Sequence, residues 1–394
     1  SDPLYILYTS GTTGTPKGVV RDNGGHAVAL HWSMRHIYGL KPGECFWAAS
    51  DVGWVVGHSY IVYAPLFAGA TVVLYEGKPV GTPDAGEFWR VIQRNQVSVF
   101  FTAPTAIRAI RKEDENGALY PASDLPSLRA VFLAGERADP DTIKWLENRL
   151  GRPVIDHWWQ TELGWPALAT SLGLGDVRRK AGSAGFPVPG YSFRVLDDDG
   201  EPVPVGKVGN ISIKCPLPPG CYQSLWGNRE GYQKAFLSYP GYYETGDAGF
   251  CDADGFMHVM GRTDDIINVA GHRLSTGQME GALAEVDGVS ECAVIGADDQ
   301  LKGMIPIAFI VASAQQNEKE LAAACIAHVR SEIGAVASVR TIHVVAALPK
   351  TRSGKILRST LRGIANGQSV TMPNTIENPE AIKAILSKVR HTNG

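Results

Sequence analysis

The sequence has few cysteines, and none of them is spaced like a metal ligand or a redox pair. No two cysteines are separated by only two residues, as in the C-x-x-C pattern. A disulfide-stapled secreted fold is therefore not indicated, and we expect scattered reduced thiols in a cytoplasmic compartment. The six cysteines are Cys45, Cys215, Cys221, Cys251, Cys292 and Cys325.

Long apolar runs and an excess of one charge are also missing. No stretch approaches the roughly 18 consecutive apolar residues that a transmembrane helix needs, so no membrane partner is indicated. The formal net charge is only −3, from 37 basic and 40 acidic residues, and no basic run occurs. Nucleic acid is therefore not an expected partner either. A hydrophobic content of 44% with 20% charged residues is typical of a globular protein.

The length of the chain predicts more than one domain. Its 394 residues exceed the size at which a single hydrophobic core keeps growing, so we expect two or three domains. The chain begins at Ser1 and reaches its first motif within ten residues, which leaves no room for a signal or transit peptide. No internal repeat is visible.

The pattern of apolar residues predicts an α/β fold in two parts. Strands are predicted at 71–75, 97–101 and 130–134, and helices around 88–92 and 106–110. Buried strands that alternate with helices favour a parallel, layered α/β arrangement, which we assign to residues 1–181. Residues 182–263 are rich in glycine and proline, with short alternating strands at 191–196 and 209–214. This texture predicts a β-rich subdomain.

A second break, near residues 261–265, precedes a unit of mixed α and β structure over 264–394. Its strands are predicted at 293–296 and 305–311, its helices at Glu318–Ile333 and 380–389. One face of the first helix is apolar, formed by Leu321, Ala322, Cys325, Val329 and Ile333. We interpret this unit as a small C-terminal lid domain.

The most informative motif lies at the start, after the apolar run of residues 4–7. Glycines let backbone N–H groups approach a phosphate closely, hydroxyls add donors, and Lys17 adds a positive charge. Pro16 stands where the Walker A pattern needs its second glycine, so this is a different phosphate loop. The alternative is a mobile turn without a ligand. The residues in question are Thr9, Ser10, Gly11, Thr12, Thr13, Gly14 and Lys17.

Two further motifs indicate a catalytic role only when they are considered together with the phosphate loop. The first, at residues 158–162, places two tryptophans before Gln160, Thr161 and Glu162. By itself it could be core packing beside a surface acid. The second is a basic loop at residues 349–355 that ends in Lys355 and precedes the apolar positions of a predicted amphipathic helix. By itself it could be a solvated surface turn.

Together with residues 243–247, these motifs resemble the signatures of the adenylate-forming acyl-CoA synthetase family, in the family's order. The resemblance covers nearly the whole chain and implies an AMP-binding domain with a C-terminal lid. Residues 21–25 and Trp165-Pro166 are most similar to propionyl-CoA synthetases within the acetyl-CoA synthetase branch. Against that family a large N-terminal region is missing, so we expect the chain to be part of a longer protein. A cytoplasmic location follows, or the mitochondrial matrix in a eukaryote.

The resemblance implies a role for many residues. Lys355, Thr161 and Arg273 would be catalytic, Glu162 would hold Mg²⁺, and Asp264 would be the hinge of the lid. ATP, CoA and their phosphates would be bound by the phosphate-loop residues above and by Gly135, Glu136, Asp156, Trp158, Gln160, Thr161, Asp247, Arg262, Ala270, Gly271, Arg273 and Arg330. In two places the chain departs from the family pattern. Arg137 replaces a proline beside the adenine, and Ala270 replaces a serine near CoA.

The implied reaction is the AMP-forming ligation of a short carboxylate to CoA. By resemblance, Val55, Val56, Ala134 and Trp159 would form the acyl pocket. Trp159 would close its floor, and Ala134, smaller than the usual valine, would favour propionate over acetate. A lysine acyltransferase or deacylase acting on Lys355 is an expected partner. The alternatives are an adenylating domain that loads a carrier protein and a nucleotide-binding fragment that is catalytically incomplete.

Overall fold

The computed structural model describes residues 2–9, 16–120, 125–269, 272–300, 303–313, 317–334, 339–350, 356–370, 372 and 376–392. These residues form two compact units. Unit 1 takes in Thr15–Thr245 and Gly249–Val259, and unit 2 takes in Gly246–Ala248 and Met260–Gly394. Within the described ranges, no helix is both long and apolar enough to cross a membrane.

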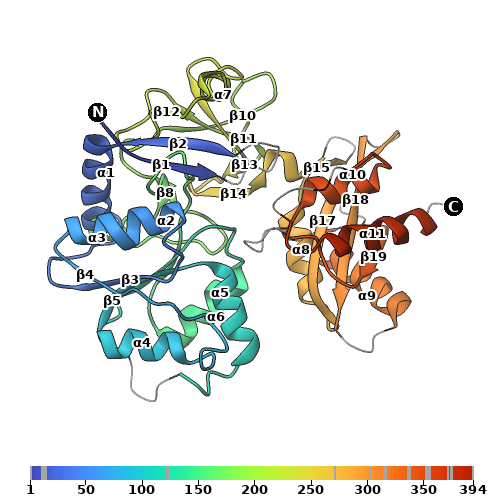
Figure 1. Ribbon diagram of the computed structural model, residues 1–394, viewed down its shortest axis with the longest axis horizontal. Helices are drawn as coiled ribbons and strands as arrows, with labels where there is room; N and C mark the ends of the chain where they lie inside the picture. Colours follow the sequence, from blue (N-terminus) through green and yellow to red (C-terminus); the bar gives the residue numbers. More distant parts are fainter. Residues whose placement is uncertain are drawn as a thin grey trace. The chain divides into compact units, whose positions relative to one another are not determined.

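A five-stranded parallel sheet forms the centre of unit 1 (Figure 1). Its spatial order is β4 (Thr71–Val72), β3 (Cys45–Ala48), β5 (Val97–Thr102), β6 (Ala130–Leu133) and β7 (Val154–Asp156). The predicted parallel α/β arrangement is thus confirmed. β4 is shorter than the predicted 71–75, since the chain leaves the sheet and Leu74 is exposed.

Alternating residues of these strands enter two different cores. Phe100 and Val131 pack into one apolar cluster, whereas Phe101 and Phe132 pack into another. Side chains of a strand point alternately to opposite faces, so both faces of the sheet are covered. The first cluster is covered by α4 (Glu87–Asn95), α5 (Pro104–Glu113) and α6 (Pro140–Leu150). The second is covered by α1 (Asn23–His36) and by the helical run α2 (Val55–Gly57), η1 (His58–Tyr63) and α3 (Ala64–Phe67).

The strands around the phosphate loop form a separate antiparallel sheet. β1 (Pro3–Thr9) pairs with β2 (Lys17–Asp22), and β2 pairs with β12 (Ser224–Leu225). The parallel arrangement assigned to residues 1–181 therefore does not extend to this hairpin. A short loop can join only antiparallel neighbours, because a parallel pair needs a long crossover.

The glycine- and proline-rich region folds into short strands, as its texture predicts. A four-stranded sheet has the order β10 (Phe193–Leu196), β11 (Gly209–Lys214), β13 (Tyr242–Cys251) and β14 (Met257–Arg262). β8 (Leu168–Ala169) pairs with β9 (Phe186–Pro187). The remaining short elements are η2 (Leu172–Leu174), α7 (Arg229–Lys234) and η3 (Thr263–Asp265).

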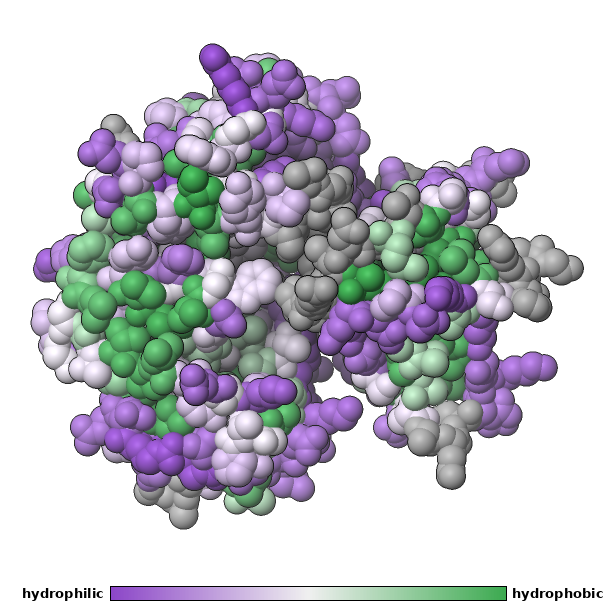
Figure 2. Space-filling model, viewed as in Figure 1, coloured by the Kyte–Doolittle hydropathy of each residue, from purple (hydrophilic) through white to green (hydrophobic). Residues whose placement is uncertain are grey.

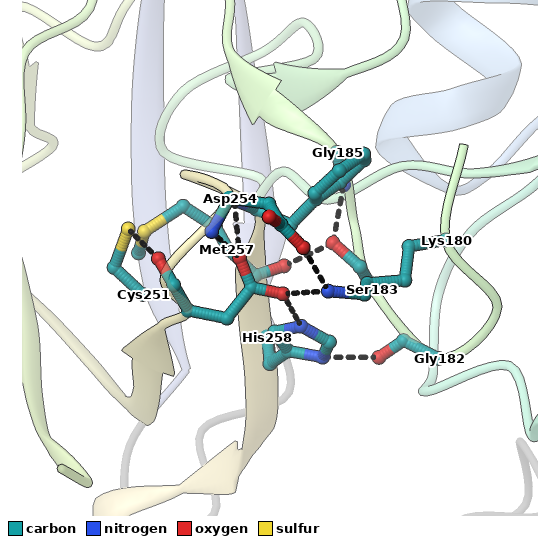
Figure 3. A network of polar contacts seen from close by, with 10 residues as sticks. Lys180, Gly182, Ser183, Gly185, Cys251, Asp254, Met257 and His258 are labelled. Carbon is teal, nitrogen blue, oxygen red and sulfur yellow. Dashed lines mark hydrogen bonds and ion pairs between the residues drawn. The ribbon is translucent and has the colours of Figure 1, made fainter. Parts of the chain in front are cut away.

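A polar network ties the chain before β9 to the turn between β13 and β14 (Figure 3). Lys180 Nζ lies 2.6 Å from a carboxylate oxygen of Asp252 and 2.8 Å from one of Asp254. His258 Nε2 lies 3.1 Å from Asp252, and Ser183 Oγ donates to the carbonyl of Met257 at 2.8 Å. These contacts fix the start of β14 to the rest of unit 1.

Unit 2 is a mixed sheet between two pairs of helices. The strand order is β16 (His272–Ser275), β15 (Ile266–Val269), β18 (Gly303–Ala312) and β17 (Val289–Asp299), with β19 (Thr341–Val345) parallel to β18. α8 (Thr276–Ala284) and α9 (Glu318–Ile333) cover one face of the sheet, while α10 (Arg358–Ala365) and α11 (Pro379–Thr392) cover the other. The predicted bounds of α9 are confirmed, and Leu321, Cys325 and Val329 are buried.

Candidate active site

The carboxyl ends of the parallel strands carry most of the predicted site residues of unit 1. Ala134, Gly135 and Glu136 follow β6, and Asp156 ends β7. In open α/β sheets ligands bind at this edge. Gly135 has a φ of 103°, which favours glycine, and it turns the chain away from the sheet. Glu136 is held by Arg108 at 2.6 Å and accepts a hydrogen bond from Thr105.

Arg137 and Asp156 bring opposite charges to the turn expected beside the adenine. Burial raises the pKa of Asp156 well above its usual value, while the N–H of Ala138 and the charge of Arg137 oppose that shift. Burial also lowers the pKa of Arg137, and the carboxylates of Asp156 and Asp139 oppose the change. The residue that departs from the family pattern is therefore electrostatically coupled to a predicted nucleotide ligand.

The segment after β7 is fixed by its side chains before it reaches Thr161. His157 is buried; its Nδ1 donates to the carbonyl of Leu133 at 2.7 Å, and its Nε2 accepts from the hydroxyl of Tyr38 at 3.0 Å. Burial lowers the pKa of His157 to about 4, which keeps the ring neutral. Gln160 donates to the carbonyl of Thr245 at 2.7 Å and accepts from the hydroxyl of Tyr243 at 3.1 Å.

Glu162 is suited to hold a magnesium ion together with a nucleotide. Mg²⁺ is usually bound by one or two carboxylates, with substrate phosphates and water completing its six ligands. Glu162 is half-buried and makes no ion pair with any described residue. Over the same residues, no group of three or more His, Cys, Asp or Glu side chains gathers into a separate metal site.

Three of the four predicted acyl-pocket residues belong to one apolar cluster. Ala134 is buried in it, and Val56 and Trp159 pack against it. The ring of Trp159 stands edge-on to the fully buried ring of Tyr60, with centroids 5.4 Å apart and an interplanar angle of 89°. Val55 begins α2 and is half-buried.

The two ends of the predicted phosphate loop lie side by side. Thr9 and Lys17 are cross-strand partners in the β1–β2 register, and Lys17 is exposed. The loop residues between them that we assign to phosphate binding lie outside the described residues. They are Ser10, Gly11, Thr12, Thr13 and Gly14.

In unit 2 the predicted ribose ligands lie close together. Arg262 Nη1 is 3.6 Å from a carboxylate oxygen of the buried Asp247. The predicted hinge residue Asp264 lies in η3, where the side chain of Arg362 donates to its carbonyl. Of the other predicted arginines in this unit, Arg273 is half-buried on β16 and Arg330 is exposed on α9. Ala270, Gly271 and Lys355 lie outside the described residues.

Comparison with known proteins identifies the family to which the chain belongs. The AMP-binding enzyme family matches residues 1–222, and the C-terminal domain of AMP-binding enzymes matches residues 278–355. The chain belongs to the AMP-binding enzyme family. Its fold is that of the adenylate-forming enzymes: over 99% of this chain and 60% of the other, it superposes on acetoacetyl-CoA synthetase from Streptomyces lividans with a TM-score of 0.87 at 23% identity.

Two relatives among those compared carry names of short-chain acyl-CoA ligases. The chain is 52% identical to the human mitochondrial acyl-CoA synthetase short-chain family member 3, over 96% of this chain and 56% of that protein. It is 46% identical to a propionate–CoA ligase of Escherichia coli, over 96% of this chain and 62% of that protein. The chain thus spans somewhat more than half the length of these relatives.

The structure adds residues to which sequence reasoning gave no role. Tyr60 packs against Trp159 of the predicted acyl pocket, Tyr243 holds Gln160, and Arg21 binds the turn at Thr161. The signal for Arg21 was present, because a charged residue directly after Val19 and Val20 interrupts a buried strand. The other two carry no signal of their own, since aromatic residues are common in cores.

Proposed function

We propose that the protein containing this chain ligates a short carboxylate to CoA, with propionate preferred over acetate. In the first step a carboxylate oxygen attacks the α-phosphorus of ATP, and the bond from that phosphorus to pyrophosphate breaks. In the second step the thiol sulfur of CoA attacks the acyl carbon, its proton is released, and AMP leaves with the bridging oxygen.

The first step needs groups that offset the charge gathering on the α-phosphate. We assign this role to Thr161, Arg273 and Lys355, while Asp247 and Arg262 hold the ribose. Glu162 would hold Mg²⁺, which supplies charge neutralisation at the phosphate oxygens when bound. For the second step, Gly271, Ala270 and Arg330 would contact CoA.

The packing of Trp159 against Tyr60, with Ala134 in the same cluster, is the observation that carries the substrate preference. An indole at this place limits the acyl chain to a few carbons. Valine at position 134 would fill the space of about one carbon. Since a buried CH₂ contributes roughly 0.8 kcal/mol, the preference for propionate should be about fourfold.

Substrate competition on the longer protein tests this proposal. We expect kcat/KM to rank propionate above acetate and butyrate, Ala134→Val to lower the propionate-to-acetate ratio by about fourfold, and Trp159→Gly to favour longer acids. Trp226→Gly, which removes an exposed indole elsewhere in unit 1, serves as the control and should leave the ranking unchanged. An unchanged ranking in Trp159→Gly would overturn the pocket assignment.

A further inference from the structure

Arg21 is a fully buried cation that donates hydrogen bonds to three backbone carbonyl groups. Its guanidinium donates to the carbonyl of Glu162 at 3.1 Å and to the carbonyls of Thr161 and Gly220. Among the residues that the structure describes, no carboxylate forms an ion pair with it. Burying a charge costs several kcal/mol, roughly, unless it is paired or hydrogen-bonded. The carbonyl oxygens therefore stand in for a counter-ion.

The turn that Arg21 binds is shaped to receive it. Gly164 has a φ of 77°, and a Cβ built there would lie 2.6 Å from Arg21 Cζ. Any larger residue at position 164 would therefore push the guanidinium out, besides straining the backbone. Ser59 secures the same glycine by donating to its carbonyl at 2.7 Å.

Both local and long-range hydrogen bonds hold the backbone of this turn. The carbonyl of Glu162 accepts from Arg21 and, at 2.7 Å, from the N–H of Tyr222. The carbonyl of Gln160 accepts from the N–H groups of Leu163 and Gly164 at 3.0 Å each. The described contacts give the carbonyl of Thr161 one donor, the side chain of Arg21. Arg21 is thus the link between strand β2 and the residue assigned to the α-phosphate.

We propose that Arg21 is a positioning residue for adenylation, because it sets the backbone from which Thr161 and Glu162 reach the nucleotide and its metal. The inference rests on the proposed function for the roles of these two residues. A guanidinium suits the task, since its planar fork can reach several carbonyls at once, whereas an ammonium is a single point on a flexible stem. Misplacing a reactive group by about 1 Å can cost on the order of 100-fold in rate.

The test uses Arg21→Lys and Arg21→Met in the longer protein. We expect pyrophosphate release on adenylation to fall by about 10- to 100-fold, while thioester formation from supplied acyl-AMP and CoA stays within about threefold of wild type. Millimolar guanidinium should restore part of the adenylation rate in Arg21→Met. Arg152→Lys is the matched control, because Arg152 also donates to a backbone carbonyl, that of Leu128, at 2.7 Å.

A binding measurement separates this inference from the proposed function. Calorimetric titration with ATP, with and without Mg²⁺, should give a Mg²⁺-dependent gain in affinity that Arg21→Lys loses and Arg152→Lys keeps. Equal losses in both half-reactions, or a gain unchanged in Arg21→Lys, would overturn the inference. If no short acid supports adenylation in the wild type, the proposed function fails, and the ATP titrations alone decide on Arg21. If Arg21→Met does not fold, Arg21→Lys is measured alone.

Discussion

Single buried side chains in this molecule affect its stability through their protonation as well as through their packing. His26 is 1% exposed, and within the part of the chain that the structure describes neither of its ring nitrogens has a hydrogen-bond partner. It lies against the rings of Tyr5 and Tyr63. Burial lowers its pKa to about 3, with the charge of Arg21 adding to the shift. Together with His157, it makes unit 1 sensitive to acid.

We expect His26 and His157 each to destabilise unit 1 as the pH falls below about 6.5, while the buried Asp156, with its raised pKa, acts in the opposite direction. Both histidines have lowered pKa values in the fold, so the unfolded chain takes up protons there while the folded chain does not. At about 1.4 kcal/mol per pH unit, each costs about 2 kcal/mol at pH 5. His26→Phe should remove one of the two contributions and raise stability at pH 5, because a buried ring without partners is replaced by an apolar one.

Tryptophan fluorescence during urea unfolding measures this directly. All nine tryptophans lie in unit 1, so the signal reports that unit alone. His31→Phe, on the exposed side of α1, is the control and should keep the wild-type pH dependence. An acid sensitivity identical in His26→Phe and wild type would contradict the assignment of this proton to His26.

At the scale of elements, a partly buried ion pair joins α8 to the start of α10. Arg358 donates to both carboxylate oxygens of Glu280, with the shortest contact at 2.8 Å. Glu280 also accepts from the N–H of Val294 on β17 at 2.8 Å. Three elements of unit 2 thus meet at the carboxylate of Glu280. One of them, α10, begins three residues after Lys355 in the sequence.

Breaking this pair from one side should destabilise unit 2 by about 3 kcal/mol, because it leaves an unpaired charge. Hydrogen exchange followed by mass spectrometry can read the effect on α8 and α10. We expect Glu280→Gln to speed exchange there, and Glu280→Met combined with Arg358→Met to restore much of the protection. Lys383→Met, which breaks the exposed Lys383–Glu380 pair, should change little. Equal protection in Glu280→Gln and wild type would refute this role.

Helices and strands could be predicted where local sequence features, such as capping residues and an apolar stripe, agreed with the packing. The helix α9 has an apolar stripe, Asn317 as its N-cap and Gly334 directly after it, and its bounds follow from the sequence. The helix α10 begins at Arg358, two residues later than its apolar pattern starts, because Ile356 pairs with Lys350 instead. Motif recognition proposed the nucleotide and acyl residues from the sequence alone. It could not find Tyr60 or the carbonyl groups that accept from Arg21, since those contacts join residues far apart in the chain.

At the scale of the whole molecule, one region of the surface of unit 1 exposes several large apolar side chains. Val62, Leu66 and Phe67 are exposed on η1 and α3, and Leu74 follows β4. Figure 2 shows a broad hydrophobic area over the region of α3. Contiguous apolar surface of this kind usually marks an interaction site or promotes aggregation.

We therefore expect this chain, when produced by itself, to self-associate as its concentration rises. Light scattering coupled to size-exclusion chromatography should show a mass that increases with loading. Leu66→Lys combined with Phe67→Glu should restore a constant mass near 42.3 kDa. Val205→Lys, at an exposed position outside this region, should not. A constant monomer mass for the unmodified chain at every loading would rule this out.

The hairpin register at the entrance of the phosphate loop has a practical consequence. Thr9 and Lys17 face each other across β1 and β2, so the backbone enters and leaves the loop at nearly one place. Directly opposed residues have Cβ atoms roughly 5 Å apart. The stretch between them can therefore be exchanged as a cassette, with its length and chemistry varied while both strands keep their pairing. The hairpin offers a ready graft site for building nucleotide loops of altered selectivity.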